Sequence, residues 1–107
     1  MAILILYYHS NMEDSLKETQ EKIASVCNAI KNVLLTKNAK YGNSALAPQR
    51  TFSKASAEEA ILVRLDDKLS RIKNSDELRK NDIFDMIGYL TLLAVQKEWT
   101  NFDELID

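Results

Sequence analysis

Residues 80–90 read KNDIFDMIGYL, and this stretch decides the fold class. A helix formed by this stretch and the apolar residues that follow, up to about Trp99, would be apolar on nearly every side, which is typical of a central helix. Asp82 and Asp85 nevertheless lie within it, three residues apart. A buried carboxylate is costly unless it is paired, hydrogen-bonded or bound to a metal. The stretch therefore predicts both a helical core and a polar site.

The composition agrees with helices. The chain has 107 residues, which is one domain by length, and only two glycines and one proline, which disfavours a fold with many turns. A net charge of −2 makes nucleic acid an unlikely partner. The single cysteine, Cys27, excludes an internal disulfide and fits a reducing compartment, so we expect the cytoplasm.

Further helices are expected on both sides of the stretch. A helix is predicted over 12–38, ended by Gly42, and a second from its cap at Ser56 to about Lys73. Asn81 is the expected N-cap of the third helix, and Thr100 or Asn101 that of a last short one. The core face of the second helix is expected to consist of Ile61, Leu62, Leu65, Leu69 and Ile72. The prediction is an all-α protein with three main helices and a short C-terminal helix, in an oligomeric helical bundle.

The N-terminal residues 1–11 leave two alternatives open. The run AILILYYH (residues 2–9) suits a short strand. Alternatively, Met12 is the natural start and residues 1–11 are an upstream extension, so that residues 12–107 form a single helical domain. His9 lies in this segment and carries little functional weight. The run is too short to span a bilayer, and we expect no membrane partner.

The predicted helix over 12–38 is long for so small a domain. Its apolar stripe runs from Leu16 to Leu34 and must be covered along its whole length. Two short helices cannot cover it alone. We therefore expect a homo-oligomer that assembles through this helix.

The carboxylates of the third helix share a face with an aromatic residue, since Asp82, Asp85 and Tyr89 stand at i, i+3 and i+7. Such a pair can hold a hard cation such as Mg²⁺, with phosphate oxygens and water completing the site. Alternatively, it can form ion pairs with a cationic stripe on the second helix. That stripe consists of Arg64, Lys68 and Arg71. Both arrangements remain open on spacing alone.

Four blocks of sequence resemble one family. They are KNAKYGNSA (37–45), the residues Arg50, Phe52 and Ser53, then KLSRI (68–72) and NDIFDMIGYL (81–90). Their order resembles the nucleotide modification associated domain 1 family of phages and bacteria. That family is distantly similar to the all-α nucleoside-triphosphate pyrophosphohydrolases, the MazG-like and dimeric-dUTPase group. The resemblance covers residues 37–93.

The resemblance implies roles for matching positions. The K-x-x-x-Y-G block carries Lys37, Tyr41 and Gly42, the K-x-x-R block Lys68 and Arg71, and an aromatic position Tyr89. Asp82 and Asp85 match the block that corresponds to the E-x-x-D metal-binding pair of the pyrophosphohydrolases. The chain departs from the E-E-x-x-E group of those enzymes, because Leu62 follows Glu58 and Glu59 where a third glutamate is expected.

The expected function is binding of a phosphorylated nucleotide, with Mg²⁺-dependent pyrophosphate hydrolysis as its catalytic form. The nucleotide-binding residues would be Lys37, Tyr41, Arg64, Lys68, Arg71 and Tyr89, and the metal ligands Asp82 and Asp85. The alternative is a non-catalytic phage protein that sequesters a nucleotide signal of host defence in the host cytoplasm. It needs the cations and the aromatic rings but no metal.

Overall fold

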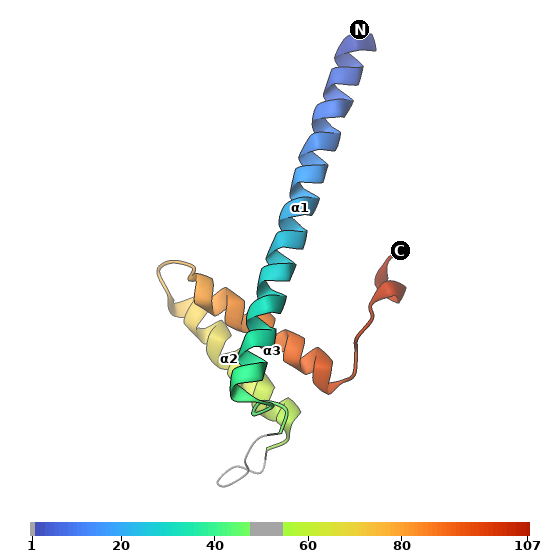
Figure 1. The fold of residues 1–107 in the computed structure, drawn as a ribbon. Coiled ribbons are helices and arrows are strands. Elements are labelled where there is room, and N and C mark those ends of the chain that lie inside the picture. Colours follow the sequence, from blue (N-terminus) through green and yellow to red (C-terminus); the bar gives the residue numbers. More distant parts are fainter. Residues whose placement is uncertain (1, 48–54) are drawn as a thin grey trace. The chain divides into compact units, whose positions relative to one another are not determined.

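The computed structural model describes residues 2–47 and 55–107, and every regular element in these ranges is helical (Figure 1). The order is α1 (Ala2–Tyr41), α2 (Ala57–Asn74), α3 (Lys80–Gln96) and a 3-10 helix, η1 (Asp103–Leu105). The all-α prediction with three main helices is thereby confirmed. Arg50, Phe52 and Ser53, which belong to the family resemblance, lie outside the described residues.

The first helix is longer than the sequence predicted. It includes the segment at residues 2–9, so the expectation of a short strand there is wrong. No glycine or proline occurs between residues 2 and 41, so nothing interrupts the helical hydrogen bonds. Gly42 ends the helix as predicted. Its φ of 69° lies in the left-handed region, and its N–H donates to the carbonyl oxygen of Asn38 over 2.7 Å.

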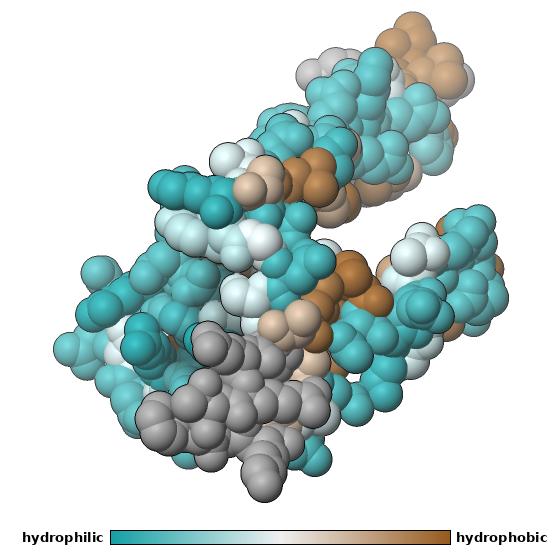
Figure 2. All heavy atoms as spheres, turned by 60° about the horizontal axis from the view of Figure 1, so that its bottom comes forward, coloured by the Kyte–Doolittle hydropathy of each residue, from teal (hydrophilic) through white to brown (hydrophobic). Residues whose placement is uncertain are grey.

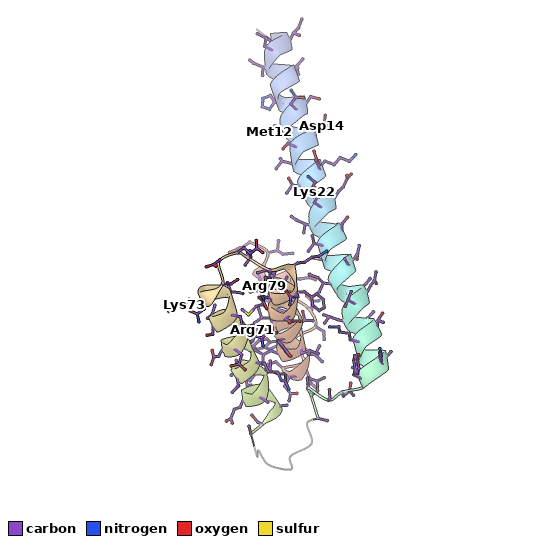
Figure 3. The ribbon with its side chains drawn as sticks, turned by 90° about the vertical axis from the view of Figure 1, so that its left-hand side faces the viewer. Met12, Asp14, Lys22, Arg71, Lys73 and Arg79 are labelled. Atoms are coloured by element: carbon purple, nitrogen blue, oxygen red, sulfur yellow. The ribbon has the colours of Figure 1, made fainter. Side chains whose placement is uncertain are left out.

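The chain divides into two compact units, residues 1–33 and 34–107. Within its described part, unit 1 is a single helix, from which the labelled side chains of Met12, Asp14 and Lys22 project (Figure 3). Unit 2 contains the last part of α1, the turn after it, α2, α3 and η1. The packing described below lies within unit 2.

Helix α2 begins as predicted. Ser56 is its N-cap, and the Ser56 hydroxyl accepts a hydrogen bond of 3.1 Å from the backbone N–H of Glu59. This bond satisfies one of the N–H groups that a helix leaves without a partner at its start.

Helix α3 starts and ends earlier than the sequence predicted. Its N-cap is Arg79, so the expectation that Asn81 caps it is wrong, although Asp82 does lie in the first turn. It ends at Gln96 rather than at Trp99. The Trp99 N–H turns back to the carbonyl oxygen of Ala94 over 2.9 Å, and Glu98 takes a φ of 60°. This hydrogen-bonded turn closes the helix even though no glycine is present.

Helices α2 and α3 run antiparallel and form the main packed pair (Figures 1 and 3). Their side chains meet in order, with Glu58 bonded to Lys97 over 2.7 Å at one end and Lys68 bonded to Asp85 further along. The buried residues that the structure describes are Ala57, Ile61, Asp82 and Gly88. A two-helix layer therefore carries most of the core.

Two leucines of the predicted core face of α2 are not buried. Leu62 and Leu69 are 44% and 56% exposed, so their assignment to the core of a single chain is wrong. Among the residues that the structure describes, α2 packs against one helix, α3, and one partner covers only one side of a helix. Leu65 and Ile72 are half-buried.

The chain ends in a single 3-10 turn. The N-cap of this turn is Phe102 rather than Thr100 or Asn101, although the Asn101 side-chain oxygen accepts a 2.7 Å bond from the N–H of Asp103. Leu105 and Ile106 are exposed. Within the described residues, no helix is both long and apolar enough to cross a membrane.

Substitutions at the two residues expected to be N-caps should affect the free energy of unfolding differently. Ser56→Ala should lower the free energy of unfolding by about 0.5–2 kcal/mol, because one N–H at the start of α2 loses its acceptor. Asn81→Ala should change it little, because Asn81 lies inside the first turn of α3 and makes no capping bond. Thermal melts followed by circular dichroism measure both. An equal loss from both variants would contradict the assignment of the caps.

Candidate functional site

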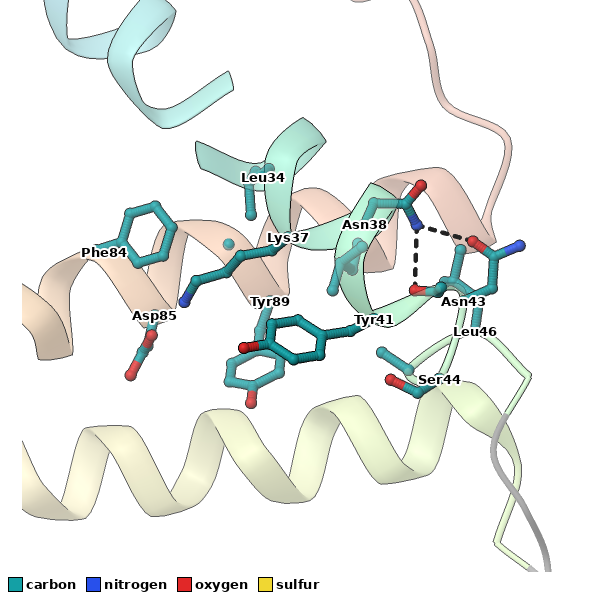
Figure 4. A pocket seen from close by; sticks show the side chains of 14 residues that line it. Leu34, Lys37, Asn38, Tyr41, Asn43, Ser44, Leu46, Phe84, Asp85 and Tyr89 are labelled. Carbon is teal, nitrogen blue, oxygen red and sulfur yellow. Dashed lines mark hydrogen bonds between the residues drawn. The ribbon is translucent and has the colours of Figure 1, made fainter. Parts of the chain in front are cut away.

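A cleft of about 270 Å³ opens between the end of α1, the turn that follows it and the middle of α3, all within unit 2 (Figure 4). More than half of its lining comes from one stretch, residues 37–46, and a second group comes from α3. The lining residues are Leu34, Lys37, Asn38, Tyr41, Gly42, Asn43, Ser44, Ala45, Leu46, Phe84, Asp85, Gly88, Tyr89 and Leu92. The cleft thus joins two of the sequence blocks singled out above.

A glycine lets α1 approach α3. Gly88 is buried, and a β-carbon built on it would lie 3.3 Å from Cδ2 of Leu34. A larger side chain at this position would occupy the space that Leu34 fills. Glycine at this position therefore leaves room for the Leu34 side chain against α3.

The turn beside the cleft is held by Asn38. Its side-chain N–H donates to the side-chain oxygen of Asn43 over 2.8 Å and to the carbonyl oxygen of Gly42 over 3.3 Å (Figure 4). The backbone N–H groups of Leu46 and Ala47 then bond to the carbonyl oxygen of Asn43. Hydrogen bonds therefore fix the chain where Tyr41 and Ser44 face the cleft.

Aromatic rings and a cation stand together in this cleft. Tyr41 comes from the end of α1, and Phe84 and Tyr89 come from α3. The Lys37 ammonium lies 5.1 Å from the centre of the Phe84 ring, a distance at which the ring face attracts a cation. Tyr41 is 63% exposed, so its ring is accessible to a ligand.

Two cations of α2 contact the α3 side of the cleft. The Lys68 ammonium lies 2.8 Å from the Asp85 carboxylate, with 16% and 27% of the two side chains exposed. The Arg64 guanidinium donates to the Tyr89 hydroxyl over 3.4 Å and lies 5.8 Å from the centre of that ring. Of the two arrangements that the spacing left open, the structure shows the ion pair with the cationic stripe for Asp85.

The structure brings most of the predicted site residues together. Lys37, Tyr41, Asp85 and Tyr89 line the cleft, and Arg64 and Lys68 contact it from α2. The other two predicted residues are not part of the lining.

Arg71 and Asp82 lie away from the cleft. Arg71 is exposed near the end of α2, toward the turn that leads to Arg79 (Figure 3). Asp82 is only 3% exposed, in the first turn of α3. The sequence stressed Asp85 as the carboxylate that needs an explanation, whereas Asp82 is the more deeply buried of the two.

Four polar or aromatic residues of the lining were not predicted: Asn38, Asn43, Ser44 and Phe84. The first three belong to the block at 37–45, and their amide and hydroxyl groups were a signal that spacing alone did not use. Phe84 was treated as part of an apolar helix. Its position beside Lys37 depends on how α1 meets α3.

A Mg²⁺ ion held by one or two carboxylates takes its other ligands from phosphate and water, so a carboxylate pair should face the ligand together. Here only Asp85 faces the cleft, and Lys68 is bonded to it. Within residues 2–47 and 55–107, no cluster of three or more His, Cys, Asp or Glu side chains could hold a metal ion. The structure therefore shows Asp85 in an ion pair with Lys68, and the Mg²⁺ site of two carboxylates, Asp82 and Asp85, stays a prediction.

Comparison with known proteins adds no family: no family model, no curated protein and no solved structure matches this chain.

The ion pair between Lys68 and Asp85 should contribute more to stability than the pair between Glu58, at the start of α2, and Lys97. Asp85→Asn leaves a half-buried ammonium without its charge partner and should lower the free energy of unfolding by about 1–3 kcal/mol. Glu58→Gln breaks the pair with Lys97, whose side chains are 40% and 41% exposed, and should cost less than about 1 kcal/mol. Chemical denaturation measures both. An unchanged stability of Asp85→Asn would show that the carboxylate is merely solvated.

Proposed function

We propose that the cleft between the end of α1 and α3 binds a phosphorylated nucleotide. One observation carries the proposal: the exposed ring of Tyr41 and the ring of Tyr89 line the same cleft as the Lys37 ammonium. A nucleotide combines a flat aromatic base with a phosphate anion. Rings and cations side by side match both of its parts.

The tyrosines are the groups that would hold the base. Stacking of a base on an aromatic side chain is worth about 1–3 kcal/mol and tolerates different bases. Arg64 donates a hydrogen bond to the Tyr89 hydroxyl, and Tyr41 lies between Asn38 and Gly42, which are joined by a hydrogen bond. Contacts within the chain therefore hold both tyrosines in place before a ligand binds.

Lys37 is the cation that would meet the phosphate. The Lys68 ammonium is bonded to Asp85, so much of its charge is neutralised, whereas the Lys37 ammonium lies over the face of the uncharged Phe84 ring. Asn43 and Ser44 add an amide and a hydroxyl to the lining. Groups of this kind fix the orientation of a ligand in a largely apolar cleft.

Of the two expected forms of this function, the geometry favours binding without metal-dependent hydrolysis. Hydrolysis of a pyrophosphate in this way requires carboxylates that present Mg²⁺ to the phosphates. The bond between Lys68 and Asp85 and the position of Asp82 outside the cleft both oppose this. We therefore propose a binder that sequesters its nucleotide in the cytoplasm, in line with the resemblance to a phage and bacterial nucleotide-associated family.

Calorimetry with a panel of nucleotides tests the proposal. Tyr41→Ala and Lys37→Met should each weaken binding by about 1–3 kcal/mol, because the first removes a stacking surface and the second a charge-assisted bond. Tyr41→Phe keeps the ring and should retain most of the affinity. Lys73→Met removes a cation outside the cleft and serves as the control. Equal losses from Lys37→Met and Lys73→Met would indicate only diffuse electrostatic attraction, and no binding of any nucleotide would refute the proposal.

The same titration in excess Mg²⁺ and in excess chelator separates the two forms of the function. Binding without a metal predicts the same affinity in both solutions and no release of pyrophosphate. Affinity that appears only with Mg²⁺ and disappears in Asp85→Asn would restore the pyrophosphohydrolase hypothesis.

A further inference from the structure

The unit 1 helix carries an apolar stripe with a period of seven residues. Its positions follow alternating steps of four and three along the helix, which is the spacing of a coiled-coil seam. The stripe consists of Ile5, His9, Met12, Leu16, Thr19, Ile23, Val26, Ile30 and Val33, and is called the heptad stripe below. A period of 3.5 residues keeps such a stripe facing a partner helix over several turns.

The stripe is sharply bounded. Between residues 12 and 33, every Leu, Ile, Val and Met lies on it, and the other positions hold charged, polar or small residues. Its large side chains are open to solvent in the single chain. Leu16, Ile23 and Val26 are 56%, 59% and 55% exposed. Figure 2 shows hydrophobic side chains at the surface of this arm of the molecule.

The positions beside the heptad stripe on the unit 1 helix are mostly polar and exposed to solvent. Lys22 and Glu18 form an ion pair of 3.0 Å on an exposed flank, with more than half of each side chain open to solvent. Thr19 is the polar member in the middle of the stripe. Its hydroxyl donates to the carbonyl oxygen of Ser15 over 3.0 Å, so it can enter an apolar interface with its donor already satisfied.

We propose that a second copy of this chain covers the heptad stripe, with the two unit 1 helices forming a parallel coiled coil in register. Unit 1 is a single helix with no other element of its own to cover the stripe, and helices of this kind owe most of their stability to packing of the apolar face. An identical helix presents an identical seam, so the stripe is complementary to itself.

The polar members of the stripe select the parallel orientation. In a parallel pair in register, Thr19 meets Thr19 and His9 meets His9, and every apolar residue meets an apolar one. In an antiparallel pair that overlaps over most of the stripe, each seam position faces one of the other kind, which places Thr19 against an apolar residue such as Leu16 or Ile23. The parallel arrangement therefore confines the polar side chains to their own layers. It extends the predicted assembly helix, at 12–38, toward the N-terminus as far as Ile5.

Light scattering at micromolar concentration tests the seam and does not depend on nucleotide binding. The chain should show at least twice its monomer mass of 12.2 kDa. Ile23→Glu and Val26→Glu place a charge in the seam and should reduce the mass to that of the monomer. Asn28→Glu adds the same charge on the outer side of the same helix and should leave the assembly intact. A monomeric wild type, or equal effects of the three variants, would overturn the proposal.

Cross-linking tests the orientation with milder changes. In a Cys27→Ser background, Met12→Cys and Ile30→Cys place thiols at the two different kinds of seam position, about 27 Å apart along the helix, given a rise of 1.5 Å per residue. Each single-cysteine variant should form a disulfide dimer with diamide in a parallel coiled coil. Asn28→Cys, on the outer side, should not. Disulfides that form only when the Met12→Cys and Ile30→Cys proteins are mixed would show an antiparallel pair and overturn the orientation.

Discussion

The close approach of Leu34 to Gly88 is the contact that brings the two walls of the cleft together. Helix α3 lacks a side chain at this point, so the end of α1 can lie against it, with 3.3 Å left between Cδ2 of Leu34 and the place of a β-carbon. The residues that follow Leu34 along α1, up to the turn at Gly42, are thereby brought over α3. Lys37 and Tyr41, which come from this end of α1, therefore line the same cleft as Phe84 and Tyr89 of α3.

The pairing of α2 with α3 supplies the other side of the arrangement. Arg64 and Lys68 stand one turn apart on α2 and meet Tyr89 and Asp85, which are likewise one turn apart on α3. Because both pairs join the same two helices, a shift of α2 along α3 would break both contacts at once. Arg64 and Lys68 therefore help to position α3 and also supply positive charge.

A large amount of apolar surface is exposed to solvent in the single chain. Within the described residues the buried apolar side chains are those of Ala57 and Ile61, which is a small core for three helices. Leu62 and Leu69 on α2 and the heptad stripe of unit 1 are exposed in the same chain. Exposed apolar area of this extent is typical of a surface that is covered by a partner. Assembly with a second copy would bury apolar side chains that one chain leaves exposed.

Some features were determined by local chemistry, and the sequence predicted them. The shortage of glycine and proline predicted helices, Ser56 marked the start of α2, and Gly42 marked the end of α1. Each of these depends on a residue and its near neighbours, because caps and breakers act within one helical turn. The spacing also offered ion pairs between the carboxylates of the third helix and the cationic stripe, and the structure shows one of them, between Lys68 and Asp85.

Other features depended on contacts between distant segments, and only the tertiary structure decided them. The sequence could not show that Lys37 and Tyr41 would share a cleft with Phe84, since that requires α1 to cross α3 at Gly88. It could not choose between a metal and an ion pair for Asp85, because the choice depends on the distance from Lys68. It placed Leu62 and Leu69 in the core, because periodicity reveals which side of a helix is apolar and not whether the same chain has a partner to cover it.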